Sequence, residues 1–221
     1  MRGRDVRRWR VQFADHYLIT IASSENEDHG WSGKPAKEAE KIFAKTYPAI
    51  HAHFEQFRSA LIKREDQGRF FWELRSCTYY ADFSRPKILY QEINRTDAYA
   101  YDTDGYYANN KLFMLPGADL SVLALLNSRA GVWFMHTFSG VPLGGFLALQ
   151  WPIMKEFPIP ILPQAERSAL EQLVNQILKT KQADPTADVA AKEREIDDRV
   201  YRLYGLSKDE IKIVEESIPK P

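Results

Sequence analysis

Alternation of apolar and polar side chains marks the start of the chain. The residues at 9, 11 and 13 are apolar, and 16–22 is rich in β-branched and aromatic side chains. This pattern is typical of half-buried strands. It predicts a pair of strands over 9–22 with a short turn at Asp15, followed by a polar loop over 23–35.

Helical periodicity follows. Apolar residues recur at steps of four, three and four between 48 and 64, which places them on one face of a helix. Pro48 suits the first turn, where its missing N–H costs nothing. A shorter helix is predicted over 36–45. The residues that define the apolar face of the longer helix are Ile50, Phe54, Phe57 and Leu61.

Short strands and turns are predicted between 70 and 118. Asp104-Gly105 signals a tight turn between two of the strands. Asp119 has the position of an N-cap for an apolar helix over 120–137. A glycine-rich loop over 139–145 and a strand over 146–150 follow. The other strands are predicted at 70–74, 87–93, 98–102 and 111–115.

The composition changes near Pro163. Narrow apolar seams, interrupted by Asp184-Pro185, predict an antiparallel helical hairpin over 163–204. Gly205 is a helix stop, and Ser207 with Glu210 forms a capping box that opens a last helix. The whole pattern predicts an α+β fold: a mixed sheet-and-helix domain over 1–162, then the hairpin and a short C-terminal helix over 163–221.

Composition narrows the class of protein. Hydrophobic residues make up 44% of the chain, the mean hydropathy is −0.44, and no apolar run approaches the roughly 18 residues that span a bilayer. A charged start and the single cysteine, Cys77, favour a soluble protein of the reducing cytoplasm.

Charge gives a mixed signal. The net charge is zero, with 30 basic and 30 acidic residues, which counts against a simple electrostatic DNA binder. Residues 1–10 nevertheless hold five arginines against one acid, Asp5. Two interpretations stay open for this run: a basic surface that meets an anionic partner, or a frayed and solvated terminus.

Motifs of catalysis are missing from the sequence. There is no phosphate-binding glycine loop and no nucleophile elbow. His51 and His53, two apart on a predicted helix, point about 200° apart and cannot easily share a metal ion. Cys77 lacks a local catalytic signature, and Glu210-Ile-Lys212 lies in an ordinary amphipathic helix. We expect no catalytic residue and no metal ligand in this chain.

An aromatic and amide-rich middle region remains. Arginine and lysine can pair with guanine edges or phosphates, asparagine with adenine, and tyrosine can stack or contact phosphate. The alternative is that the aromatic residues are strand and core residues and that the asparagines mark turns. Composition alone favours this alternative.

The order of several motifs resembles the TaqI-like C-terminal specificity domain. That domain follows the adenine-N6 methyltransferase part of type IIG restriction enzymes and related phage-defence methyltransferases. Two of the runs are Trp-Glu-Leu-Arg-Ser-Cys-Thr-Tyr-Tyr at 72–80 and Asp-Gly-Tyr-Tyr-Ala-Asn-Asn at 104–110. The others lie at 2–10, 47–50, 85–90, 123–128, 195–206 and 210–215.

The resemblance implies a module that reads double-stranded DNA for methyltransferase and endonuclease domains of a parent enzyme. That enzyme would use S-adenosylmethionine and Mg²⁺, whereas this chain would hold no cofactor. A second hypothesis is a protein-interaction module that acts through the 163–204 hairpin. The expected DNA-binding residues are Arg7, Arg8, Arg75, Tyr79, Tyr80, Arg85, Lys87, Asn94, Arg95, Asn109, Asn110, Lys111, Ser139, Gly144 and Gly145.

Overall fold

The computed structural model describes residues 1–13, 15–94, 98–139 and 147–218. The chain forms two compact units: Met1–His16 together with Ala81–Pro221, and Tyr17–Tyr80. We describe each unit by itself. The predicted boundary at 162 and 163 lies inside the larger unit and stays a prediction.

A three-stranded antiparallel sheet is the centre of the larger unit. Its middle strand is β3 (Lys87–Gln91), which pairs with β5 (Tyr99–Asp102) on one side and β6 (Leu112–Pro116) on the other. The strands predicted at 87–93, 98–102 and 111–115 are thus confirmed. Two shorter pairs complete the strands: β1 (Val6–Arg7) with β2 (Arg10–Val11), and β4 (Ile93–Asn94) with β7 (Leu147–Ala148).

The two faces of this sheet are covered differently. On one face Tyr90 is paired with Tyr99 and Phe113, and this face joins the main core beneath the helices. On the other face Leu89 and Ala100 are fully buried with Val6 of the N-terminal segment. Alternation along the strands produces both faces, because successive side chains point to opposite sides.

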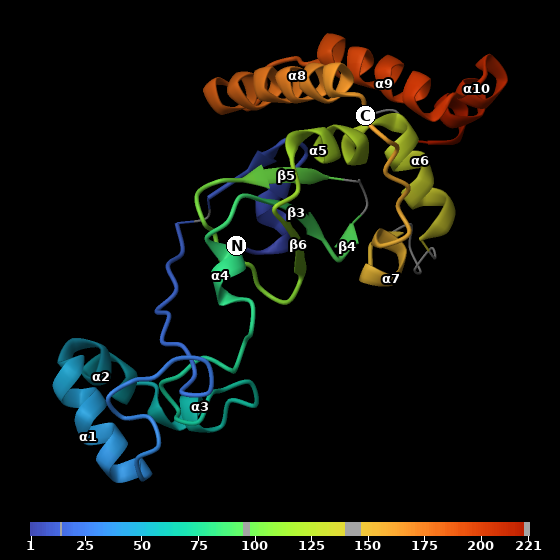
Figure 1. Ribbon diagram of the computed structural model, residues 1–221. Coiled ribbons are helices and arrows are strands. Elements are labelled where there is room, and N and C mark those ends of the chain that lie inside the picture. The colour runs from blue at the N-terminus through green and yellow to red at the C-terminus, as the bar shows by residue number, and fades with distance from the viewer. Residues whose placement is uncertain (14, 95–97, 140–146, 219–221) are drawn as a thin grey trace. The chain divides into compact units, whose positions relative to one another are not determined.

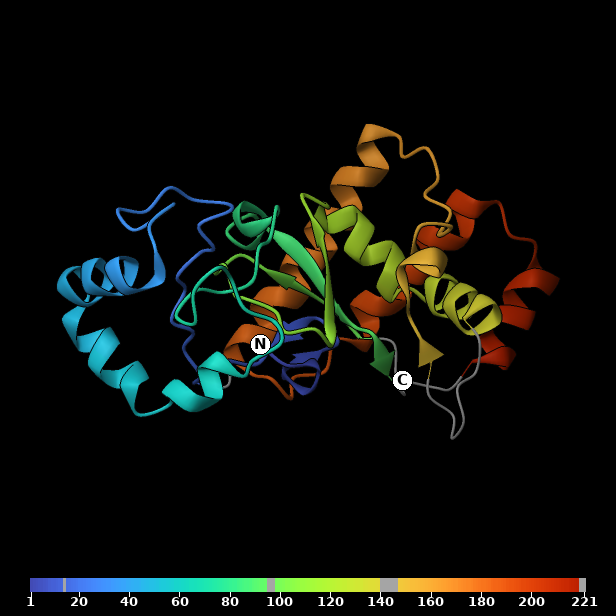
Figure 2. The ribbon, with the colours of Figure 1, turned by 90° about the horizontal axis from the view of Figure 1, so that it is seen from below.

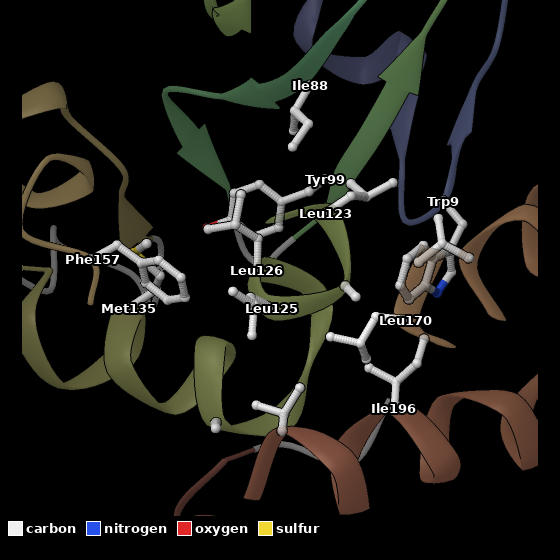
Figure 3. Close-up of a cluster of buried hydrophobic side chains, with 14 of the residues drawn as sticks. Trp9, Ile88, Tyr99, Leu123, Leu125, Leu126, Met135, Phe157, Leu170 and Ile196 are labelled. Atoms are coloured by element: carbon white, nitrogen blue, oxygen red, sulfur yellow. The ribbon is translucent and has the colours of Figure 1, made fainter. Parts of the chain in front are cut away.

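Helices form two layers on the tyrosine face. Helix α5 lies between the sheet and the α8–α9 hairpin, as Figure 1 shows. Trp9, Leu126 and Leu170 come from three different parts of the chain and meet in this core (Figure 3). The helices of the larger unit are α5 (Leu120–Asn127), α6 (Arg129–Phe138), α7 (Trp151–Met154), α8 (Gln164–Ala183), α9 (Ala190–Tyr204) and α10 (Lys208–Ser217); α4 (Tyr80–Phe83) begins at the last residue of the smaller unit.

The predicted helical hairpin exists as α8 and α9, and its apolar seam is buried. Leu170, Val174 and Ile177 of α8 and Val200 of α9 have no exposed surface. They belong to the same core as the sheet and α5. The apolar seam of the hairpin is therefore used within the unit.

Local capping signals are confirmed. The Asp119 side chain accepts a hydrogen bond from the Val122 amide at the start of α5. Ser207 and Glu210 form a reciprocal capping box at the start of α10. Gly205 ends α9 in the left-handed conformation, with φ of 66°, which costs glycine little because it has no Cβ.

The prediction of a single helix over 120–137 was wrong, because this stretch forms two helices, α5 and α6. Ser128 adopts an extended conformation and its hydroxyl caps the Gly131 amide at the start of α6. A Cβ added at Gly131 would lie 2.2 Å from the Leu125 carbonyl oxygen. Only glycine tolerates this close approach of the two helices. Apolar periodicity continued across the break and concealed it.

The smaller unit is built on aromatic stacking. The rings of Phe43 and Trp72 are parallel, with centroids 4.9 Å apart, and Phe70 stacks on Trp72 at 4.8 Å. The Glu73 carboxylate, fully buried, accepts hydrogen bonds from the Trp31 indole and the Arg69 amide. Helices α1 (Ala36–Thr46) and α2 (Pro48–Glu55) pack against one another (Figure 2), and α3 (Arg58–Ile62) follows.

Three predictions for this region were wrong. Residues 16–22 and 70–74 form no strands, and the helix predicted over 48–64 is divided into α2 and α3. Tyr17 is 86% exposed whereas Ile21 is buried. The β-branched and aromatic residues of 16–22 therefore have no neighbouring strand with which to pair. In 70–74 ring stacking and the buried Glu73 hold a series of turns.

None of the described helices is long and apolar enough to cross a membrane.

Candidate nucleic-acid interface

The N-terminal arginine run forms a tight hairpin in the larger unit. Arg7 of β1 and Arg10 of β2 are direct cross-strand partners, and Arg8 and Trp9 make the turn between them. Trp9 has φ of 64°, a backbone conformation that is a genuine outlier for a bulky side chain. Such a conformation persists only where the surroundings fix it.

Trp9 is fixed by burial and hydrogen bonds. It is 2% exposed. Its amide donates to the Tyr99 carbonyl at 3.0 Å, and its indole N–H donates to Glu193 at 2.6 Å. Trp9 and Leu170 belong to the same buried cluster (Figure 3). The turn is thereby attached to both the sheet and helix α9.

Arg8 is held at the same point. Its Nε donates to Glu193 at 2.7 Å, and its guanidinium also donates to the Asn127 carbonyl at 2.6 Å. Burial raises the pKa of the Glu193 carboxyl, but the charge of Arg8 and the N–H donors of Trp9 and Arg8 outweigh burial and hold the pKa below its ordinary value. Arg8, predicted as a DNA contact, is placed where it anchors the hairpin.

Arg4, just before the hairpin, and Arg7 and Arg10 within it all keep exposed surface. Arg4 and Arg7 are exposed and Arg10 is half-buried. None of the three forms an ion pair with a carboxylate in the described part of the chain. Like charges directly opposite one another on paired strands are destabilising. The Arg7–Arg10 pair therefore keeps an unfavourable arrangement that an anionic partner would relieve.

An amide-rich loop adjoins this segment. The N-terminal ammonium donates to the Tyr107 carbonyl at 2.6 Å, and the Asn109 amide donates to the Met1 carbonyl at 3.0 Å. Asn109, Asn110 and Lys111 are exposed. The predicted asparagines thus lie close to the start of the arginine-rich segment.

A polar groove of about 540 Å³ runs between β2, the 102–106 loop and α8. Its lining combines three basic residues, two aspartates, amides and a stacked aromatic pair, Phe13 and Tyr106, whose ring centroids are 5.5 Å apart. Residues of the groove that can donate hydrogen bonds to an anion or a base include Arg10, Gln12, Asn175, Lys179 and Gln182.

Lys87 is not on this surface, and its assignment as a DNA contact is corrected. Its side chain is fully buried and its Nζ lies 2.5 Å from Asp102 and 2.6 Å from the Phe83 carbonyl. Asp102 also accepts hydrogen bonds from the Asp104 and Tyr106 amides. The pair holds the start of the 103–111 loop.

The other predicted residues are distributed over the molecule. Arg85 is exposed and pairs with Asp82 at 2.8 Å. Ser139 is buried and its hydroxyl donates to the Met135 carbonyl, so it is corrected from a surface contact to a helix-end residue. Arg95, Gly144 and Gly145, and the side chain of Asn94, lie outside what the structure describes.

Three predicted residues lie in the smaller unit. Arg75 is exposed, with a guanidinium nitrogen 3.7 Å from Asp66. The Tyr80 hydroxyl donates to the Arg75 carbonyl at 2.8 Å, and Tyr79 is 45% exposed. They form a group of their own, so the structure sorts the predicted residues into two sets.

Sequence reasoning missed Arg4 and Arg10 as individual candidates. The arginine run was the signal that could have found them. The run alone does not tell which guanidinium turns inward, because that depends on Glu193, 185 residues from Arg8.

A cluster of possible metal ligands in the smaller unit is an ion-pair network. Ligand atoms of Glu40, His51 and Glu55 lie within 4.8 Å of one another. The Arg58 guanidinium already lies 2.5 Å from both Glu40 and Glu55. Its hydrogen bonds are the largest of the effects that lower the pKa of Glu40 to about 2. Arg58 supplies the cation that these carboxylates need.

Comparison with known families decides the identity of the domain. The family model of the TaqI-like C-terminal specificity domain matches residues 1–159. The chain belongs to this family. The match confirms the resemblance over 1–159, whereas the runs at 195–206 and 210–215 lie outside the matched residues and stay a prediction. Membership indicates that the specificity domain serves DNA sequence recognition in a restriction–modification enzyme, in association with catalytic domains. No curated protein matches the chain.

Proposed function

We propose that this chain is the module that reads double-stranded DNA for a type IIG endonuclease and adenine-specific methyltransferase. The observation that carries the proposal is the Arg7–Arg10 pair. Two arginines that form no ion pair with a carboxylate in the described part of the chain lie opposite one another on a hairpin whose turn is attached to the core; the Arg7 guanidinium donates only to the Val6 carbonyl, at 3.4 Å. Phosphate oxygens would turn this repulsion into two charge-assisted contacts.

Positioning and reading fall to different residues in this proposal. Arg4, Arg7 and Arg10 hold the backbone and fix the register of the duplex. Asn110 presents an exposed amide that can pair bidentately with adenine in the major groove. Asn109 lies beside it, and its side-chain oxygen also accepts the Lys111 amide N–H at 3.1 Å. Each such pair would discriminate by about 1–3 kcal/mol against a wrong base.

The chemistry belongs to the catalytic domains of the parent enzyme. S-adenosylmethionine would supply the methyl group there, and Mg²⁺ would serve the endonuclease. The residues of this chain bind and orient the duplex so that the target adenine can leave the helix and enter the methyltransferase.

A second surface is suited to a protein contact. Helices α6 and α10, with Phe157 and Pro158, line an apolar groove of about 390 Å³. Ile213 in the groove is 55% exposed and the nearby α6 residue Phe138 is 58% exposed. Exposed apolar patches of this kind mark interaction sites. We propose this groove for the catalytic domains, in preference to the 163–204 hairpin, because the seam of the hairpin is buried.

Selection from a randomised duplex library tests the proposed function. The full chain is incubated with the library at about 50 and 200 mM salt, and the retained duplexes are sequenced. An enriched motif whose retention falls steeply with salt is expected. Retention of no duplex, together with salt-insensitive self-association of the chain, would overturn DNA reading and favour a protein-interaction module.

A further inference from the structure

A row of lysines runs along α1 of the smaller unit. Lys37, Lys41 and Lys45 are spaced by four residues and are exposed. Four residues advance a helix by about 6 Å and turn it by about 40° beyond a full turn, so the three side chains share one face. Ala39 and Phe43 bury the opposite face of α1 in the aromatic core.

The carboxylates of α1 are engaged elsewhere. Glu38 pairs with Lys34 at 3.3 Å. Glu40 pairs with Arg58, and with His51 at 3.2 Å. Within the described ranges none of the three lysines lies in an ion pair with a carboxylate. The outer face of α1 is left with three uncompensated positive charges.

This arrangement is unfavourable for the isolated helix. Like charges four residues apart destabilise a helix, and α1 contains two such pairs along one line. The row extends over about 12 Å, a length of duplex that carries roughly seven phosphates. An extended anion with regularly spaced charge would compensate all three lysines together.

We infer that the α1 lysine row is a second, sequence-independent contact for the phosphate backbone of the DNA. The inference rests on the proposed function, since it takes the same duplex as its partner. The contact supplies affinity and salt dependence and reads no bases. It assigns a binding role to the smaller unit that is separate from Arg75, Tyr79 and Tyr80.

The test measures duplex binding by the full chain over a range of salt concentrations. For the Lys37→Gln/Lys41→Gln/Lys45→Gln variant, the slope of log K against log salt should become shallower by about 2.7, or 0.9 for each lost phosphate contact. The motif enriched from the library should stay the same. The unfolding midpoint of the variant should not fall, because two repulsive pairs are removed.

The matched control is Lys155→Gln/Lys212→Gln in the larger unit. Both lysines are exposed and already lie near Glu156 and Glu216, at 3.5 and 3.9 Å. Their removal should leave the slope nearly unchanged. If the slope of the control became shallower by as much per removed lysine as that of the triple variant, the change would be a general effect of net charge. That result would overturn the inference.

The remaining outcomes separate the inference from the proposed function. Wild-type binding with an enriched motif, and an unchanged slope in the triple variant, would overturn the α1 contact and leave DNA reading intact. Failure of the wild-type chain to retain any duplex would overturn both. A Lys41→Glu variant adds a second readout: it should be at least as stable as wild type and should bind the duplex more weakly.

Discussion

Replacement of Lys87 by methionine tests the buried ion pair that holds the sheet to the 103–111 loop. Neither Lys87 nor Asp102 has exposed side-chain surface, and their charged atoms are 2.5 Å apart. Methionine keeps most of the volume but leaves the Asp102 carboxylate buried with only the amides of Asp104 and Tyr106. Breaking a buried pair in this way costs about 3–5 kcal/mol.

Urea unfolding followed by circular dichroism measures this loss. The control is Lys111→Met: the Lys111 side chain is 64% exposed and its ammonium is 3.5 Å from Glu92, so this change should alter the free energy of unfolding by less than about 1 kcal/mol. The Lys87→Met/Asp102→Asn double variant should lose less than the sum of the single changes, because the unpaired charge is gone.

A contrary result would return Lys87 to the surface. If Lys87→Met were as stable as wild type and instead made the salt dependence of DNA binding shallower, the assignment of Lys87 to the core would be refuted.

Three further predictions concern the larger unit. Burial raises the pKa of Asp197 to about 6, although the Arg129 amide donates a hydrogen bond to the carboxylate, so the folded state binds this proton more tightly than the unfolded state. Wild type should therefore lose stability as the pH rises from about 4 to 7, and the free energy of unfolding of Asp197→Asn should rise relative to that of wild type by up to about 3 kcal/mol, measured by urea unfolding at both pH values. Asn127→Leu should lose about 2–4 kcal/mol in the same assay, because the buried amide pairs with both the N–H and the C=O of Tyr99; a loss below about 1 kcal/mol would contradict this. Gly205→Ala should lower the thermal midpoint by the equivalent of about 1 kcal/mol, since φ is 66° there, and an unchanged midpoint would refute the strain.

Features with a local cause could be predicted from the sequence. The Asp119 cap and the Ser207–Glu210 capping box lie within a few residues of the amides they bind, so the residue types and their spacing are sufficient. The central strands were also found, because short apolar runs between turn residues mark strands even where both faces are buried. The break at Ser128 was missed because apolar residues continue on both sides of it.

Features that depend on distant partners could not be predicted. Lys87 opens a strand and resembles an exposed basic residue until Asp102 is seen across the sheet from it. Arg7 and Arg8 are neighbours in one arginine run, yet only Arg8 meets Glu193 of α9. In the candidate site, sequence therefore identified the basic segment and the asparagine loop, and the structure sorted inward from outward side chains.

The most direct test of the account is the salt dependence of duplex binding by the Arg7→Gln/Arg10→Gln variant. The duplex is the one enriched by the wild-type chain. The account predicts that the slope of log K against log salt becomes shallower by about 1.8, corresponding to two phosphate contacts, with no loss of stability because the cross-strand repulsion is removed. A variant that binds this duplex with wild-type affinity and an unchanged slope would contradict the claim that the arginine hairpin holds the DNA.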